Sequence, residues 1–212
     1  MVHWVVPLHN NKSVYDARNY RGIHLTSQLS KAAERILATL FVPQIIAIGA
    51  FGHNQFAYMP ERGAQDALAH LATTWISLFC KKRKIAVYCS DVSKAFDKVS
   101  SQRLLSKLHA KGMPADILAV LASWLSARKA NVAVGGKFSR DMVLRDMVYQ
   151  GTVLGPPLWN SFFEDAATAI RFNDFCEIVF ADDLNAYKAF ELDTGNEVMF
   201  SDLKNCQCEV QN

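Results

Sequence analysis

The chain has 212 residues, half of them hydrophobic, and a formal net charge of +3. That length can bury a substantial core and indicates one domain or two small lobes. The sequence has no uninterrupted run of about 18 apolar residues, so we expect no membrane span. The first residues lack the pattern of a signal peptide. Five cysteines without a Cys-x-x-Cys pair disfavour a disulfide framework or a structural zinc site. We therefore expect an intracellular protein, in the nucleus or cytoplasm, that is not secreted and has no membrane partner.

The net charge hides an asymmetry between the two halves of the chain. Residues 1–110 carry 14 Lys and Arg against 6 Asp and Glu, whereas residues 111–212 carry 9 against 14. A basic front half suits a bound polyanion, and an acidic back half suits bound cations. An ordinary solvated surface would show the same imbalance, so charge alone leaves both interpretations open.

The first half of the chain alternates short strands with amphipathic helices. The helices are indicated by apolar residues at helical spacing, by capping serines and by a basic run that follows the second helix. In chain order we expect strands over 4–8 and 20–25, a helix from Ser27 or Ser30 to about residue 40, a buried turn over 43–52, a helix over 60–80 and a strand over 85–91.

The second half continues the alternation with longer loops. We expect helices over 101–112 and 114–128, a pair of strands over 131–149, a helix over 155–172, a hairpin over 176–187 and a polar helix from about residue 196. Such irregular alternation predicts an α+β fold in which helices cover one face of a sheet.

Adjacent carboxylates, Asp182 and Asp183, occupy the middle of the apolar hairpin at 176–187. Two neighbouring anions at the tip of a buried sheet repel each other unless a cation lies between them. Asp91 follows a second apolar strand, and three carboxylates on two strands are what a two-metal phosphoryl-transfer site requires. A receiver domain also pairs acidic residues, but its pair precedes the phosphoacceptor, whereas here the pair follows Asp91.

Two further motifs are ambiguous when read alone. Asp91 can ligate a cation together with the Val92 carbonyl, and the ring of Phe96 can lie beneath a sugar. Asp91 could equally cap a helix, and Phe96 could be a core residue. Gln150 and Gly151 lead into a helix, and a glycine backbone lets a nucleotide or template base approach closely. A plain strand-to-helix turn explains the same two residues.

Taken together, these motifs resemble the successive palm motifs of reverse transcriptases, specifically those of non-LTR (LINE-type) retrotransposons. The resemblance runs from about Trp4 to Tyr187 and also includes two motifs of the front half. The matching segments are 19–25 with 31–36, 55–63 with 66–68, Asp91 with 95–97, 150–151 with 154–156, and 181–183. Each motif is weak by itself, but five in the family's order are a specific pattern.

The resemblance implies a function for each motif. Asp91, Asp182 and Asp183 would be catalytic and, with the Val92 carbonyl, would bind two Mg²⁺ ions, with Mn²⁺ as an alternative. Nucleotide binding would involve Arg21, Lys12, Phe96, Gln150 and Gly151, with Phe96 as the sugar gate. The partners would be an RNA template, a DNA primer and deoxynucleoside triphosphates, while the oligomeric state is not indicated.

The implied architecture is a right-hand polymerase with a palm, in which helices back an antiparallel sheet, and a fingers subdomain. We expect fingers over residues 1–84 and palm over 85–212, with fingers segments interleaved and the thumb absent. The implied function is that of an RNA-directed DNA polymerase. The alternative is a truncated, catalytically silent retroelement remnant that keeps the palm fold and nucleic-acid binding.

Overall fold

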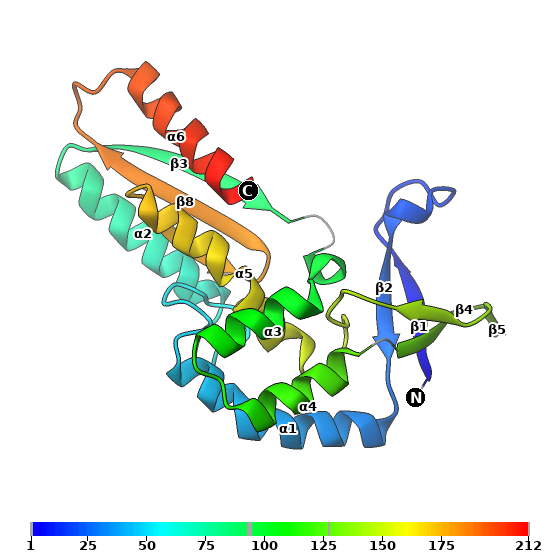
Figure 1. Cartoon of the computed structure of the whole chain (residues 1–212). Helices are drawn as coiled ribbons and strands as arrows, with labels where there is room; N and C mark the ends of the chain where they lie inside the picture. The colour runs from blue at the N-terminus through cyan, green and yellow to red at the C-terminus, as the bar shows by residue number, and fades with distance from the viewer. Residues whose placement is uncertain (1, 93–94, 127, 212) are drawn as a thin grey trace. The chain divides into compact units, whose positions relative to one another are not determined.

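The computed structural model describes residues 2–92, 95–126 and 128–211. The chain forms two compact units, each built from two separate stretches of sequence. Unit 1 contains residues 1–50 and 94–162, and unit 2 contains residues 51–93 and 163–212. Each unit has its own sheet and helices (Figure 1).

Unit 1 contains a mixed sheet in which four strands follow the order β2-β1-β4-β5 and β6 also pairs with β4. The strands are β1 (Val2–His9), β2 (Tyr20–Leu25), β4 (Arg128–Val134), β5 (Lys137–Phe138) and β6 (Met142–Leu144). β1 runs parallel to β4, and the other pairs are antiparallel. The parallel pair is possible because helices supply the long connection that parallel strands need.

Two of the helices that unit 1 contains begin at serines that satisfy free backbone N–H groups of the first turn. Ser27 accepts a hydrogen bond from the Ser30 N–H, and Ser100 accepts one from the Arg103 N–H. The helices of unit 1 are α1 (Gln28–Ala47), α3 (Ser101–Ala110), α4 (Ala115–Leu125) and the first part of α5 (Gly155–Phe172), with short 3-10 turns η1 (Ala17–Asn19) and η2 (Ala95–Lys98).

The structure corrects three of the predicted helix boundaries. α1 continues through Pro43 to Ala47, where a buried turn was expected, because Phe41 and Ile45 bury that face of the helix. α2 begins at Ala64 rather than at residue 60, because the Asp66 carboxylate accepts the Gly63 N–H and so caps the N-terminus of the helix at that point. α4 ends at Leu125, so that residues from 128 onward join β4.

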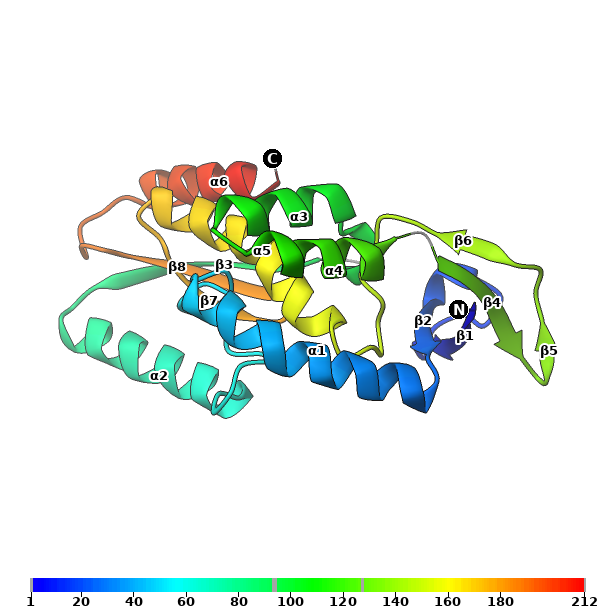
Figure 2. The ribbon, with the colours of Figure 1, turned by 60° about the horizontal axis from the view of Figure 1, so that its bottom comes forward.

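Unit 2 contains an antiparallel sheet of three strands in the order β3-β8-β7, counted over the described part of the chain. The strands are β3 (Lys84–Asp91), β7 (Cys176–Phe180) and β8 (Asp183–Phe190). α2 (Ala64–Cys80) lies on one side of this sheet, and α6 (Asn196–Gln211) with the end of α5 lies on the other (Figure 2).

Alternation along the strands gives the two faces of this sheet different partners. On one face, the Tyr187 ring meets the Trp75 ring of α2 at a centroid distance of 6.1 Å. On the other face, Lys188 donates to Asp202 of α6 at 2.9 Å. Helices therefore cover both faces, whereas the sequence pattern predicted cover on one face only. The reason is that β8 carries apolar or aromatic side chains on both sides.

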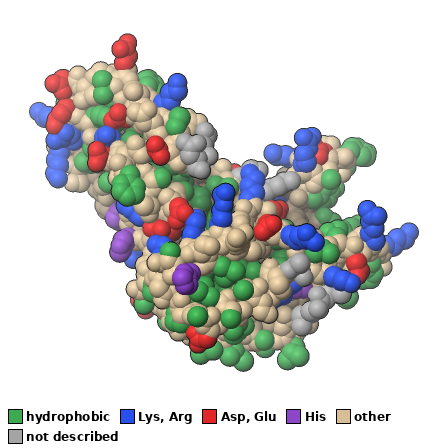
Figure 3. Space-filling model, in the orientation of Figure 1, with side chains coloured by type: hydrophobic (Ala, Val, Ile, Leu, Met, Phe, Trp, Pro, Cys, Tyr) green, Lys and Arg blue, Asp and Glu red, His purple; other side chains and the backbone are tan. Residues whose placement is uncertain are grey.

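Lys and Arg side chains gather at the upper left of Figure 3, over the turn that joins α2 to β3. Lys81 is the C-cap of α2, and Arg83 forms an ion pair with Glu191. Cations at this position favourably oppose the negative end of the helix. This basic turn lies at the opposite end of β3 from Asp91.

Most predicted elements are confirmed, including the bounds of α5 and the hairpin that joins β7 to β8. No helix within the described ranges is long and apolar enough to cross a membrane. The assignment of fingers to residues 1–84 and palm to residues 85–212 stays a prediction.

Candidate catalytic carboxylates

The Asp182–Asp183 hairpin has a tight two-residue loop. Phe180 at the end of β7 pairs with Asp183 at the start of β8, which leaves Ala181 and Asp182 as the loop. Ala181 has a φ of 60°. A positive φ at the first loop position matches the tight turns that connect hairpin strands, although glycine is the residue that usually occupies it.

Asp91 lies directly opposite Asp183, because the register of β3 and β8 pairs these two residues at the end of the ladder. Residues opposed in an antiparallel pair point to the same face, with Cβ atoms about 4.5–5.5 Å apart. Both side chains are exposed, and both line the same cavity. Two strands separated by about 90 residues of sequence thus present two carboxylates side by side.

Asp182 occupies the loop next to this pair. Burial raises the pKa of the Tyr58 phenol, and the negative charge of Asp182 raises it further. Tyr58 therefore lies within electrostatic range of the Asp182 carboxylate. Val92 follows Asp91 where β3 ends, so its carbonyl is released from the strand ladder.

A cavity of about 530 Å³ adjoins the two opposed carboxylates. Its walls combine the ends of the three strands with the first half of α2, including Leu68, Leu71, Ile178 and Phe180. The cavity gives a cation room beside Asp91 and Asp183, and a cation there would neutralise their like charges.

The donor set fits a hard divalent cation, because Mg²⁺ and Mn²⁺ prefer carboxylate, carbonyl and amide oxygens. Besides the two carboxylates, the Asn185 amide lines the same cavity. Over residues 2–92, 95–126 and 128–211, however, no three His, Cys, Asp or Glu side chains are grouped to hold a metal. The structure shows the opposed pair, and convergence of all three aspartates stays a prediction.

Asn185 is a site residue that the motif reading missed. Its Oδ1 accepts a hydrogen bond from the Cys89 thiol at 3.1 Å, directly across the ladder. The signal was present in the alternation of β8, since residues two apart lie on one face and Asn185 is two residues after Asp183.

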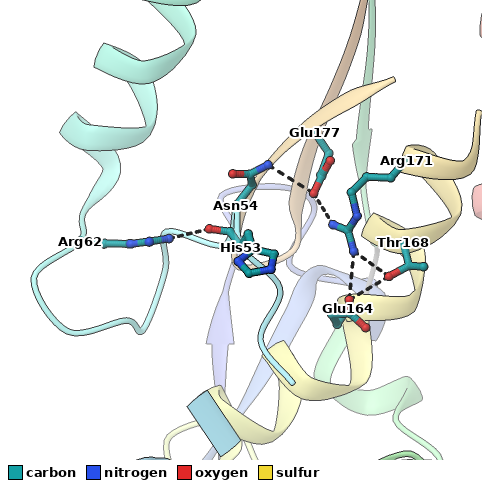
Figure 4. A network of polar contacts seen from close by, with 7 residues as sticks. All are labelled: His53, Asn54, Arg62, Glu164, Thr168, Arg171 and Glu177. Carbon is teal, nitrogen blue, oxygen red and sulfur yellow. Dashed lines mark hydrogen bonds and ion pairs between the residues drawn. The ribbon is translucent and has the colours of Figure 1, made fainter. Parts of the chain in front are cut away.

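A polar network connects β7, the first strand of the hairpin, to α5 and to Asn54 (Figure 4). The buried Glu177 carboxylate pairs with Arg171 of α5 and accepts a hydrogen bond from the Asn54 amide at 3.4 Å. Arg171 also donates to Glu164 at 3.1 Å and to Thr168 at 2.7 Å. Sequence reasoning missed this network, although a glutamate inside an apolar strand is a signal that a buried partner exists.

The predicted nucleotide-binding residues belong to unit 1. Arg21 on β2 and Lys12 in the preceding loop are exposed. Phe96 in η2 stacks on the ring of Trp159 at a centroid distance of 5.7 Å. That packing also agrees with a core position for Phe96, so its role as a sugar gate stays a prediction.

Gln150 and Gly151 are fixed against β2. The His24 N–H donates to the Gln150 carbonyl at 2.8 Å, and Gly151 has a φ of +94°. A Cβ added at Gly151 would come within 3.0 Å of the His24 carbonyl oxygen. Glycine is therefore required here by the close approach of two backbone segments and by the positive φ.

The side chains behind this turn form a buried cluster. Tyr149 contacts His3 and His24, each with a ring-centroid distance of 5.3 Å. Burial lowers the pKa of both histidines to about 4, and the charge of Arg128 contributes at His3. Both histidines are therefore uncharged near pH 7.

The geometry agrees with what comparisons of the chain with known proteins show. Residues 9–211 match the family model described as reverse transcriptase (RNA-dependent DNA polymerase). One relative, the probable RNA-directed DNA polymerase from transposon BS of Drosophila melanogaster, is 32% identical over 147 residues, which cover 69% of this chain and 16% of the relative. Another, the RNA-directed DNA polymerase from mobile element jockey of Drosophila funebris, is 25% identical over 85% of this chain and 20% of the relative.

The fold has counterparts among solved structures. Telomerase from Candida albicans matches with a TM-score of 0.62 and 11% identity, over 99% of this chain and 39% of that one. The chain thus has the right-hand polymerase fold and spans about a fifth or less of the curated relatives named above. On the match over residues 9–211, the chain belongs to the reverse transcriptase family.

Proposed function

We propose that the chain is the part of a retrotransposon RNA-directed DNA polymerase that carries its catalytic carboxylates. The observation that supports this most directly is the pairing of Asp91 with Asp183 across the β3–β8 ladder. Each of the two comes from a segment that resembles a different motif of the reverse transcriptase family, to which the chain belongs. The proposed partners are an RNA template, a DNA primer and deoxynucleoside triphosphates, and the proposed location is intracellular.

In this proposal Asp91, Asp182, Asp183 and the Val92 carbonyl hold two divalent cations. Cations held there would supply acidification of the primer 3′-hydroxyl and charge stabilisation of the leaving pyrophosphate. The opposed pair fixes two of the carboxylates on strands, and Asp182 lies in the two-residue loop that directly precedes Asp183. Such prior positioning is the main contribution that protein groups make to phosphoryl transfer.

The residues of unit 1 would bind the nucleotide and template. Arg21 and Lys12 are exposed cations that can pair with a triphosphate. The Gln150–Gly151 turn offers a backbone surface to a base, and Phe96 offers a ring edge to a sugar. Unit 2 would include the palm sheet.

Primer extension on an RNA template with Mg²⁺ tests the proposal. We expect Asp183→Asn to lower the extension rate about a hundredfold or more, since metal stabilisation of the transition state contributes several kcal/mol. Asp193→Asn makes the same charge change at an exposed turn after β8 and should extend at the wild-type rate. Equal extension by wild type and Asp183→Asn would refute the assigned role of Asp183, whereas extension absent from both would favour a catalytically silent remnant.

A further inference from the structure

The segment that precedes α2 adds a short stretch of backbone to the free edge of β7. The Phe56 N–H donates to the Val179 carbonyl, and the Val179 N–H donates to the Asn54 carbonyl, each at 2.9 Å. Gln55 lies between these bonds and forms a parallel bridge with Val179. These bonds hold the Gln55 backbone beside Val179, which directly precedes Phe180, the last residue of β7 before the loop.

The side chain of Gln55 is buried, with 4% of its surface exposed, and its Oε1 reaches two backbone groups. Oε1 accepts the Ala57 N–H at 2.9 Å and the Ala181 N–H at 3.1 Å. The second bond joins residues 126 positions apart in the sequence. One amide oxygen thus ties the segment before α2 to the first loop residue of the Asp182–Asp183 hairpin.

Ala181 is the residue of this loop whose conformation needs support. A side-chain-bearing residue at positive φ costs about 1–2 kcal/mol, and the surrounding structure must hold it there. The hydrogen bond to Gln55 fixes the Ala181 N–H and with it the peptide between Phe180 and Ala181, from which the loop turns towards Asp182. Without it, the loop can relax towards negative φ and turn Asp182 and the start of β8 away.

The Gln55 backbone is itself anchored from the other side. The Arg62 guanidinium donates to the His53 carbonyl at 2.7 Å and to the Gln55 carbonyl at 3.3 Å. The bond to His53 is drawn in Figure 4. The guanidinium carbon also lies 5.4 Å from the centre of the Phe56 ring. Because the Gln55 backbone is anchored in this way, its side chain can hold the Ala181 N–H in a fixed place.

We propose that Gln55 is a positioning residue that sets the geometry of the Asp182–Asp183 hairpin and so the seating of a divalent cation at its carboxylates. This inference rests on the proposed nucleotidyl-transfer function. Gln55 touches no reacting atom, and its part is to hold the Ala181–Asp182 loop in the conformation that presents Asp183 opposite Asp91. Because Oε1 accepts both of these hydrogen bonds, glutamate should replace glutamine and an apolar side chain of similar length should not.

Hydrogen exchange on the full chain tests the positioning role without any enzymatic readout. Gln55→Met keeps the length of the side chain and removes the acceptor, whereas Gln55→Glu keeps an acceptor oxygen. We expect the Ala181 amide to exchange about three- to tenfold faster in Gln55→Met, as loss of one hydrogen bond allows, and at the wild-type rate in Gln55→Glu. Amides at the far end of the β3–β8 ladder, around Lys84 and Phe190, should be unchanged, and so should every amide measured in Gln207→Met, an exposed control on α6.

The functional consequence is measured with the same variants. Mn²⁺ titration followed by electron paramagnetic resonance should give weaker binding in Gln55→Met and recovery in Gln55→Glu. Primer extension should show a lower kcat in Gln55→Met with little change in the KM for the nucleotide.

Either of two exchange results would overturn the inference: wild-type exchange at Ala181 in Gln55→Met, or faster exchange spread evenly over the whole sheet. Unchanged Mn²⁺ binding despite a loosened loop would also overturn it. If the wild-type chain extends no primer, the proposed function fails, while exchange and Mn²⁺ binding still decide the role of Gln55.

Discussion

Acidification should destabilise unit 1 through its two buried histidines. His3 and His24 are 0% and 3% exposed, and each has a pKa lowered to about 4. Burial is the main cause at both residues. At His3, the adjacent charge of Arg128 acts in the same direction, with a distance of 3.0 Å between Arg128 Nη1 and His3 Nε2. Since a guanidinium can only donate, His3 Nε2 must be the unprotonated acceptor in this bond.

The sign and size follow from proton linkage. An unfolded histidine has a pKa near 6.5, so between pH 6.5 and 4 the unfolded chain binds protons that the folded chain excludes. The free energy of unfolding is therefore highest above pH 6.5 and falls as the pH drops towards 4. At pH 4.5 the loss amounts to at most about 2.5 kcal/mol for each histidine.

Urea denaturation followed by tryptophan fluorescence at pH 7.5 and 4.5 measures this loss. His24→Phe preserves the aromatic contacts with Tyr149 and removes one titrating group, so its loss between the two pH values should be smaller than that of wild type by up to about 2.5 kcal/mol. His109→Gln, on the exposed side of α3, should lose as much as wild type. An equal pH dependence in His24→Phe and wild type would refute the reasoning, because other groups would then account for the acid sensitivity.

Two backbone substitutions should move stability in opposite directions. Gly151→Ala should lower the free energy of unfolding by about 1–3 kcal/mol, because its Cβ would meet the His24 carbonyl and its φ is positive; a urea midpoint at or above that of wild type would contradict this. Ala181→Gly should raise the melting temperature, corresponding to about 0.5–1 kcal/mol, because glycine adopts φ near 60° freely. A lower melting temperature for Ala181→Gly would show that the loop is not strained.

Features set by local chemistry could be predicted from the sequence. Gly155 and Phe172 mark the ends of α5 as expected, and the apolar alternation around residues 176–187 gives the hairpin and its acidic tip. These signals lie within one turn of helix or one pair of strands, where cap residues and side-chain periodicity decide the outcome.

Features set by distant contacts could not be predicted in this way. Pro43 reads as a helix stop, yet burial of the neighbouring Phe41 and Ile45 carries α1 past it. The pairing of Asp91 with Asp183 depends on a strand register that no local pattern specifies. Likewise, nothing around Gln55 indicates that its side chain accepts a hydrogen bond from a loop 126 residues later.

The most direct test of the central claim is to map where a divalent cation sits on the folded chain. Fe²⁺ with ascorbate cleaves backbone next to the bound ion, and the cut sites can be read by mass spectrometry. We predict cleavage at two places distant in sequence, around Asp91 and around Asp182–Asp183, suppressed by excess Mg²⁺ and lost in Asp183→Asn but not in Asp193→Asn. Cleavage near only one of these places, or an unchanged pattern in Asp183→Asn, would contradict the claim that both strands hold the same cation.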